Sequence, residues 1–104
     1  MVTVANAGHL APYRNGEEME VESSLPLGLA EDCRYAETSV QLERGDRLTL
    51  ISDGVVEATD AEGNLFGFER TRVVSGQSAA AIAATAQRFG QEDDITVLTV
   101  ARTV

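Results

Sequence analysis

The pattern of apolar and polar residues predicts strands in the first half of the chain and at its end. Short runs of β-branched and aliphatic residues bounded by turn residues predict strands at Val2–Asn6, Leu10–Tyr13, Met19–Glu22, Ala36–Leu42, Arg47–Ser52 and Ile95–Ala101. Asn15-Gly16 predicts a hairpin between the second and third runs. Arg44-Gly45-Asp46 predicts another hairpin between the fourth and fifth. The last run is apolar on both faces, which predicts a central strand.

Helical patterns occupy most of the second half. Val55–Ala58 predicts one helical turn, and Phe68–Val74 predicts a short helix. Ser78 is a suitable N-cap for an alanine-rich helix that runs to Phe89 and ends at Gly90. In this helix the core-facing stripe is expected to consist of Ile82, Ala86 and Phe89. Antiparallel strands followed by helices and a final strand indicate an α+β layered fold.

Two acidic turns flank the strands predicted at Arg47–Ser52 and Ile95–Ala101. Asp53 directly follows the first strand, and Asp93-Asp94 directly precedes the second. If these strands pair antiparallel, the end of one lies beside the start of the other, so the carboxylates gather at one rim of the sheet. Unpaired charge there is costly unless a cation is present, and magnesium and manganese prefer such oxygen ligands. The pattern therefore predicts part of a metal site.

Composition narrows the class of protein. A chain of 104 residues with 43% hydrophobic residues forms one domain at most. Its net charge of −9 disfavours nucleic acid and anionic membrane surfaces as partners, and no apolar run approaches the length of a membrane span. The single cysteine, Cys33, cannot form an internal disulfide, so we expect a cytoplasmic location.

A set of short motifs follows in a fixed order along the chain. They are Asn6-Ala7-Gly8-His9, Leu25-Pro26-Leu27-Gly28, Gly45-Asp46, Ser52-Asp53-Gly54-Val55, Glu57-Ala58, Phe66-Gly67 and Asp93-Asp94-Ile95-Thr96-Val97. No single motif is decisive, but the ordered set resembles the C-terminal half of the stage II sporulation protein E-type phosphatases. These are the bacterial branch of the metal-dependent type 2C serine/threonine phosphatases. The resemblance covers residues 1–104 as a partial domain.

This resemblance implies an antiparallel β-sandwich flanked by helices, with two manganese or magnesium ions at one end. By motif match, Asp53 and Asp93 resemble family ligands that hold the same ion. Gly54, Asp94, Glu57 and His9 would lie around these ligands without binding the ion directly. The family's bridging aspartate belongs to an N-terminal half that these residues do not include. We therefore expect the isolated chain to be inactive.

Simpler interpretations exist for each of these residues. Asp53 alone would be read as a turn former that caps the following helical turn. Asp93-Asp94 would be read as a polar loop, and Glu57 as a solvent-facing residue. For His9 we favour a hydrogen-bonded structural role, while a catalytic or ligand role stays open. The motif order is what makes metal ligation the better interpretation of the two aspartates.

The implied activity is hydrolysis of phosphoserine or phosphothreonine on a small phosphorylated anti-anti-sigma-type protein, in a sigma-factor partner-switching pathway. A strand that begins almost at Met1 suggests a chain taken from a longer protein. The resemblance implies that this protein carries a sensor or receiver module before the phosphatase. The alternative is a non-catalytic module that binds a partner; retention of both Asp53 and Asp93 counts against it. Uncovered sheet edges also lead us to expect a homodimer of the fragment.

Overall fold

The computed structural model describes residues 1–7, 9–20, 23–24, 37–91 and 93–103. Its elements are β1 (Val2–Ala7), β2 (Tyr13–Arg14), β3 (Glu17–Glu18), β4 (Ser23–Ser24), β5 (Glu37–Val40), β6 (Arg47–Ile51), α1 (Asp53–Val56), α2 (Gly67–Val74), α3 (Ala79–Gly90) and β7 (Val97–Ala101). The predictions for Gly8, the loop at Leu25–Gly28 and Cys33 lie outside the described residues, as do the ends of two predicted strands at 21–22 and 36.

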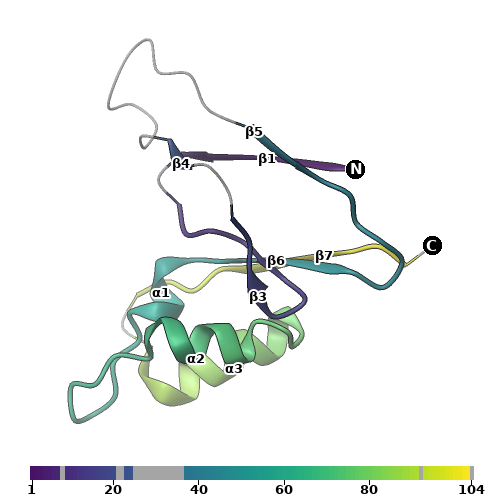
Figure 1. Cartoon of the computed structure of the whole chain (residues 1–104). Helices are drawn as coiled ribbons and strands as arrows, with labels where there is room; N and C mark the ends of the chain where they lie inside the picture. The colour runs from purple at the N-terminus through teal and green to yellow at the C-terminus, as the bar shows by residue number, and fades with distance from the viewer. Residues whose placement is uncertain (8, 21–22, 25–36, 92, 104) are drawn as a thin grey trace.

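The described strands form two sheets. One has the order β4-β1-β5 and the other the order β3-β2-β6-β7. Every pair is antiparallel except the short β1–β4 pair, which is parallel. Figure 1 shows α2 and α3 packed on the side of the four-stranded sheet that faces away from β1. The predicted α+β class, with antiparallel sheets flanked by helices, is confirmed.

One predicted hairpin is confirmed and the other is wrong. Asn15 and Gly16 have φ angles of 51° and 85° and join β2 to β3 in a tight turn. The segment around Gly45 does turn, but β5 pairs with β1, whereas β6 pairs with β2 and β7. The turn therefore carries the chain from one sheet to the other. A local turn signal cannot distinguish this crossing from a hairpin, because the partner strands lie far away in sequence.

The prediction of a central strand at the end of the chain is also wrong for the part that the structure describes. β7 starts at Val97, pairs with β6 and forms the edge of the four-stranded sheet. Val97 packs against the helix-covered core, while Leu98 is 55% exposed and Val100 is 41% exposed on the opposite face. Apolar residues on both faces therefore do not require a neighbouring strand on each edge, since one face of β7 packs on the core and the other is exposed.

The core lies between the four-stranded sheet and the helices. Ile82 and Ala86 of α3 are fully buried, and Phe89 meets Phe66 edge to face with the ring centroids 5.2 Å apart. The predicted stripe on this helix is therefore confirmed. The Ser78 hydroxyl accepts a hydrogen bond from the Ala81 N–H, as expected of an N-cap. None of the helices in the described part of the chain has the length and apolar character needed to cross a membrane.

Candidate functional site

The site begins where β6 and β7 meet. Ile51 is opposite Val97 in the last step of the antiparallel ladder. Beyond it the Ser52 N–H donates to the Thr96 carbonyl at 2.9 Å, and the Thr96 N–H donates to the Ser52 hydroxyl at 2.8 Å. These two bonds extend the pairing past the strands and fix the chain directions on both sides. Asp53 follows at once as the first residue of α1.

Gly54 brings the acidic segment against α1. It is buried, and a β-carbon at this position would overlap the carbonyl oxygen of Asp94 and lie 3.5 Å from that of Asp93. The backbone after β6 thus touches the backbone before β7. The structure therefore places Asp53 and the Asp93-Asp94 pair at the same rim of the sheet.

The three carboxylates at this rim face solvent. Asp53, Asp93 and Asp94 are all exposed, and none of the ion pairs among the described residues involves them. The Asp93 carboxylate accepts a hydrogen bond from the Asp94 N–H at 2.8 Å. The backbone carbonyl of Asp93 accepts one from the Gln91 side-chain amide at 3.1 Å. Carboxylate oxygens that arrive from two segments suit a hard divalent cation.

The carboxylates at this rim could supply part of the ligands of a metal ion. Two carboxylates, even with a third nearby, leave most positions around magnesium or manganese to other ligands. Across the described residues, no group of three or more His, Cys, Asp or Glu side chains is placed to hold a metal ion. The residues present therefore agree in chemistry with such an ion but do not surround it.

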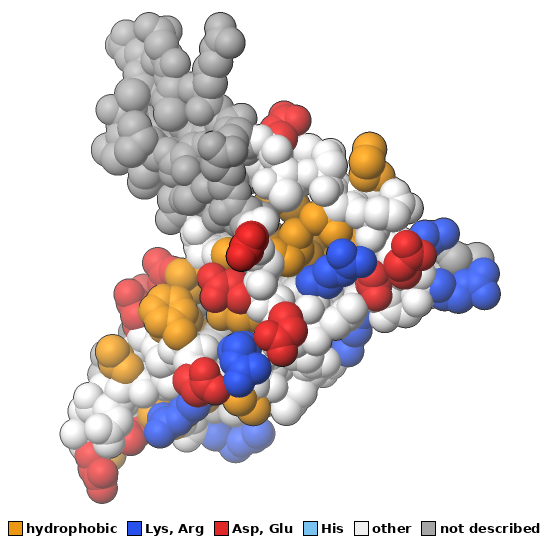
Figure 2. Space-filling model, in the orientation of Figure 1, with side chains coloured by type: hydrophobic (Ala, Val, Ile, Leu, Met, Phe, Trp, Pro, Cys, Tyr) orange, Lys and Arg blue, Asp and Glu red, His pale blue; other side chains and the backbone are white. Residues whose placement is uncertain are grey.

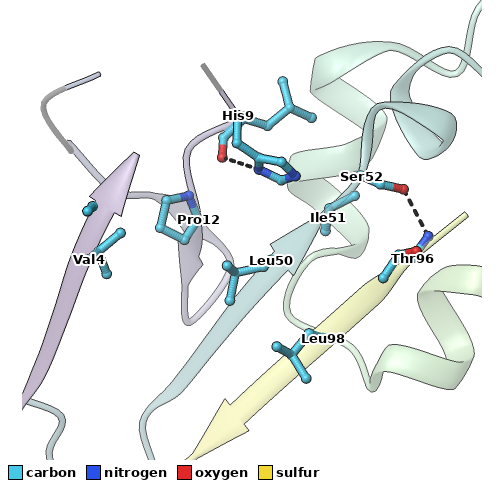
Figure 3. Close-up of a pocket in the computed structure, with 10 residues that line it drawn as sticks. Val4, His9, Pro12, Leu50, Ile51, Ser52, Thr96 and Leu98 are labelled. Carbon is cyan, nitrogen blue, oxygen red and sulfur yellow. Dashed lines mark hydrogen bonds between the residues drawn. The ribbon is translucent and has the colours of Figure 1, made fainter. Parts of the chain in front are cut away.

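Glu57 and His9 are the other side chains that the family resemblance places around the ligands. Glu57 is exposed at the end of α1, where its backbone N–H donates to the Asp53 carbonyl. His9 follows β1 and lines a mainly apolar cavity of about 330 Å³ between the sheets, together with Leu10, Leu50, Ser52 and Leu98 among others. Its Nδ1 lies 2.9 Å from the Leu10 carbonyl oxygen, and Figure 3 shows the ring pointing toward the end of β6. These contacts connect Glu57 to Asp53 through the backbone and place His9 in the same cavity as Ser52, the residue before Asp53.

The face that carries the helices has charges of both signs (Figure 2). Figure 2 shows acidic and basic side chains interspersed over the face that carries the helices, with apolar side chains between them. The ion pairs on this part of the molecule include Arg72 with Glu69 at 2.8 Å and Arg72 with Glu17 at 3.7 Å. The guanidinium of Arg72 lowers the pKa of the Glu69 carboxyl through a direct hydrogen bond. Neither of these ion pairs includes Asp53, Asp93 or Asp94.

Two residues important to the rim were not predicted from the sequence. The sequence identifies Ser52 only as part of a turn and Gly90 only as the end of a helix. In the structure Ser52 bonds Thr96, while Gly90 lies against Thr59, whose N–H donates to its carbonyl at 2.9 Å. A serine immediately before an aspartate at a strand end was the available signal for the first. For Gly90 the end of a helix is a sufficient explanation from sequence, and no local pattern indicates its contact with Thr59.

Comparison with known proteins identifies the family of this chain. Residues 1–103 match the family model described as stage II sporulation protein E. The chain belongs to the stage II sporulation protein E family. Among solved structures it is similar to the SiaA-PP2C domain of Pseudomonas aeruginosa, with a TM-score of 0.63 and 29% sequence identity over 95% of this chain and 46% of that one. A search of curated proteins found no match.

Membership of the stage II sporulation protein E family confirms the resemblance drawn from the ordered motifs. The likeness to a type 2C phosphatase domain makes this chain part of a phosphatase-type domain, in a class of generally metal-dependent enzymes. The chain spans about half the length of the solved domain that it matches.

Proposed function

We propose that this stage II sporulation protein E-family chain is the C-terminal half of a protein serine/threonine phosphatase domain and supplies part of its dinuclear metal site. The observation that supports this most directly is the meeting of Asp53 with the Asp93-Asp94 segment at one rim, through the β6–β7 pairing and the close approach at Gly54. Two segments 40 residues apart thus bring exposed acidic residues to one rim of the sheet. Like charges repel, so an ion is the natural partner.

In this proposal Asp53 and Asp93 would hold the same manganese or magnesium ion through their carboxylate oxygens. The other ligands, including a bridging aspartate, would come from the part of the domain outside these 104 residues. In a two-metal phosphatase the bound ions activate a water molecule and neutralise the phosphoryl oxygens. Asp94 would stabilise the turn that presents Asp93, because its N–H donates to the Asp93 carboxylate.

The proposed substrate is a phosphoserine or phosphothreonine on a small anti-anti-sigma-type regulatory protein. This choice rests on the family resemblance alone. A surface with a net charge of −9 repels an anionic phosphoprotein except where a bound cation attracts it, which favours approach at the acidic rim once it is loaded.

The test is phosphatase activity of the longer protein on a serine-phosphorylated protein substrate with added manganese. We expect Asp53→Asn and Asp93→Asn each to reduce turnover to background, because each removes a charged ligand. Asp60→Asn is the matched control, because the Asp60 carboxylate accepts hydrogen bonds from the Glu62 and Asn64 N–H groups of its own loop. Full activity in either ligand variant would overturn the proposal. Inactivity of the unaltered protein with retained partner binding would support a binding module instead.

A further inference from the structure

The acidic segment before β7 is held alongside α1 at both of its ends. At one end Ser52 and Thr96 exchange two hydrogen bonds, one of them to the serine hydroxyl. At the other end the Thr59 N–H donates to the Gly90 carbonyl at 2.9 Å. A β-carbon at Gly90 would overlap the Thr59 carbonyl oxygen and approach the Asp60 α-carbon to 3.3 Å. Both ends of the segment are thus in backbone contact with residues that flank α1.

Between these ends the contact depends on a second glycine. A β-carbon at Gly54 would overlap the Asp94 carbonyl, which is a backbone atom and cannot move aside as the tip of a flexible side chain does. Gly54 does not adopt a left-handed backbone conformation, so its small size alone is what the position requires. Any larger residue would push the Asp93-Asp94 segment away from Asp53.

We propose that Ser52, Gly54 and Gly90 are positioning residues, which fix the acidic segment against α1 and so set the separation of Asp53 and Asp93 before an ion binds. This inference rests on the proposed function, in which the two aspartates share one ion. Exposed carboxylates repel each other and would spread apart on a loose loop. Holding them in place preorganises the site, as supporting contacts do for metal ligands generally.

The experiment is a manganese titration of the isotopically labelled chain, followed by nuclear magnetic resonance. In the unaltered chain a shared paramagnetic ion should broaden the amide signals of residues 53–57 and 93–96 at the same manganese concentration. Ser52→Ala removes the acceptor for the Thr96 N–H, and Gly54→Ala displaces the acidic segment. For both we expect the manganese affinity to fall by about 10- to 100-fold, the usual effect of losing a contact that supports metal ligands.

Two further variants separate positioning from general damage. Ser52→Thr keeps a hydroxyl and should recover most of the affinity lost in Ser52→Ala. Gly76→Ala is the matched glycine control, because a β-carbon there would meet its nearest atom at an ordinary 3.7 Å and the residue is exposed. It should bind manganese like the unaltered chain. If Gly54→Ala does not fold, the comparison of Ser52→Ala with Ser52→Thr tests the positioning role.

The possible results distinguish this inference from the proposed function. If the unaltered chain binds manganese and the folded Ser52→Ala and Gly54→Ala variants bind it equally well, the positioning role is wrong. If the unaltered chain shows no broadening at these segments, Asp53 and Asp93 do not hold manganese without the ligands that lie outside these 104 residues. Hydrogen exchange at the Thr96 amide then tests positioning without metal. Faster exchange in Ser52→Ala and Gly54→Ala, but not in Gly76→Ala, supports the inference, and equal exchange overturns it.

Discussion

Asp46 shows how one side chain can connect distant parts of this chain. Its carboxylate accepts hydrogen bonds from the Arg14 guanidinium at 2.6 Å, the Asn15 amide at 3.0 Å and the Glu43 N–H at 2.9 Å. These bonds, that of Arg14 foremost, hold the pKa of Asp46 at about 2, below its ordinary value of 3.8. Asp46 thereby joins the β2–β3 hairpin to the turn that leads into β6.

We expect Asp46 to make the fold sensitive to acid. Because its pKa is lower in the folded chain than in the unfolded chain, its stabilisation is present above the ordinary value of 3.8 and is lost as the pH falls toward about 2. Urea unfolding of the wild type should show a falling midpoint across this range, with a smaller fall in Asp46→Asn. Asp60 and Glu69, whose pKa values are also lowered, titrate in both proteins and provide the common background. Equal acid losses in the two proteins would contradict this assignment.

Among the elements, those with local signals were predictable and those with distant partners were not. Asn15-Gly16 sets its own hairpin, and Ser78 caps its own helix. The pairing of β5 with β1 depends on residues more than thirty positions away, and no local pattern encodes it. The same limit applies to the candidate site. The acidic turns were recognisable, but the bond from Thr96 to the Ser52 hydroxyl spans 44 positions.

The cap of α3 gives a prediction at this scale. Replacing Ser78 by alanine removes the acceptor for the Ala81 N–H and should lower the free energy of unfolding by about 1 kcal/mol. Ser78→Asp retains an acceptor and should keep most of that stability. Chemical denaturation of both variants measures the difference. Identical losses in the two variants would mean that the cap bond has no role in stability.

At the scale of the whole molecule, the edge formed by β7 remains uncovered in the described structure. Leu98 and Val100 are 55% and 41% exposed, and unpaired sheet edges favour association between chains. The net charge of −9 opposes it. We therefore expect the 104-residue chain to form a dimer that strengthens as salt screens the repulsion.

Sedimentation at low and high salt measures this association. Leu98→Lys should weaken the dimer by placing a charge on the exposed face of the edge strand β7. Val73→Lys is the matched control, because Val73 is also apolar and is 64% exposed but belongs to α2, away from β7. A monomer at every concentration and salt level would show that the edge does not associate, and equal weakening by both variants would show that it is not the interface.

The central claim is that Asp53 and Asp93 bind one ion together, and a double-mutant cycle on manganese affinity tests it most directly. Manganese binding to the chain is measured by electron paramagnetic resonance for the wild type, Asp53→Asn, Asp93→Asn and the double variant, with Asp60→Asn as the control. If the ion is shared, each single variant should lose nearly as much affinity as the double variant, with a coupling free energy of about 0.5–3 kcal/mol. Independent, additive losses, or wild-type affinity in either single variant, would contradict the account.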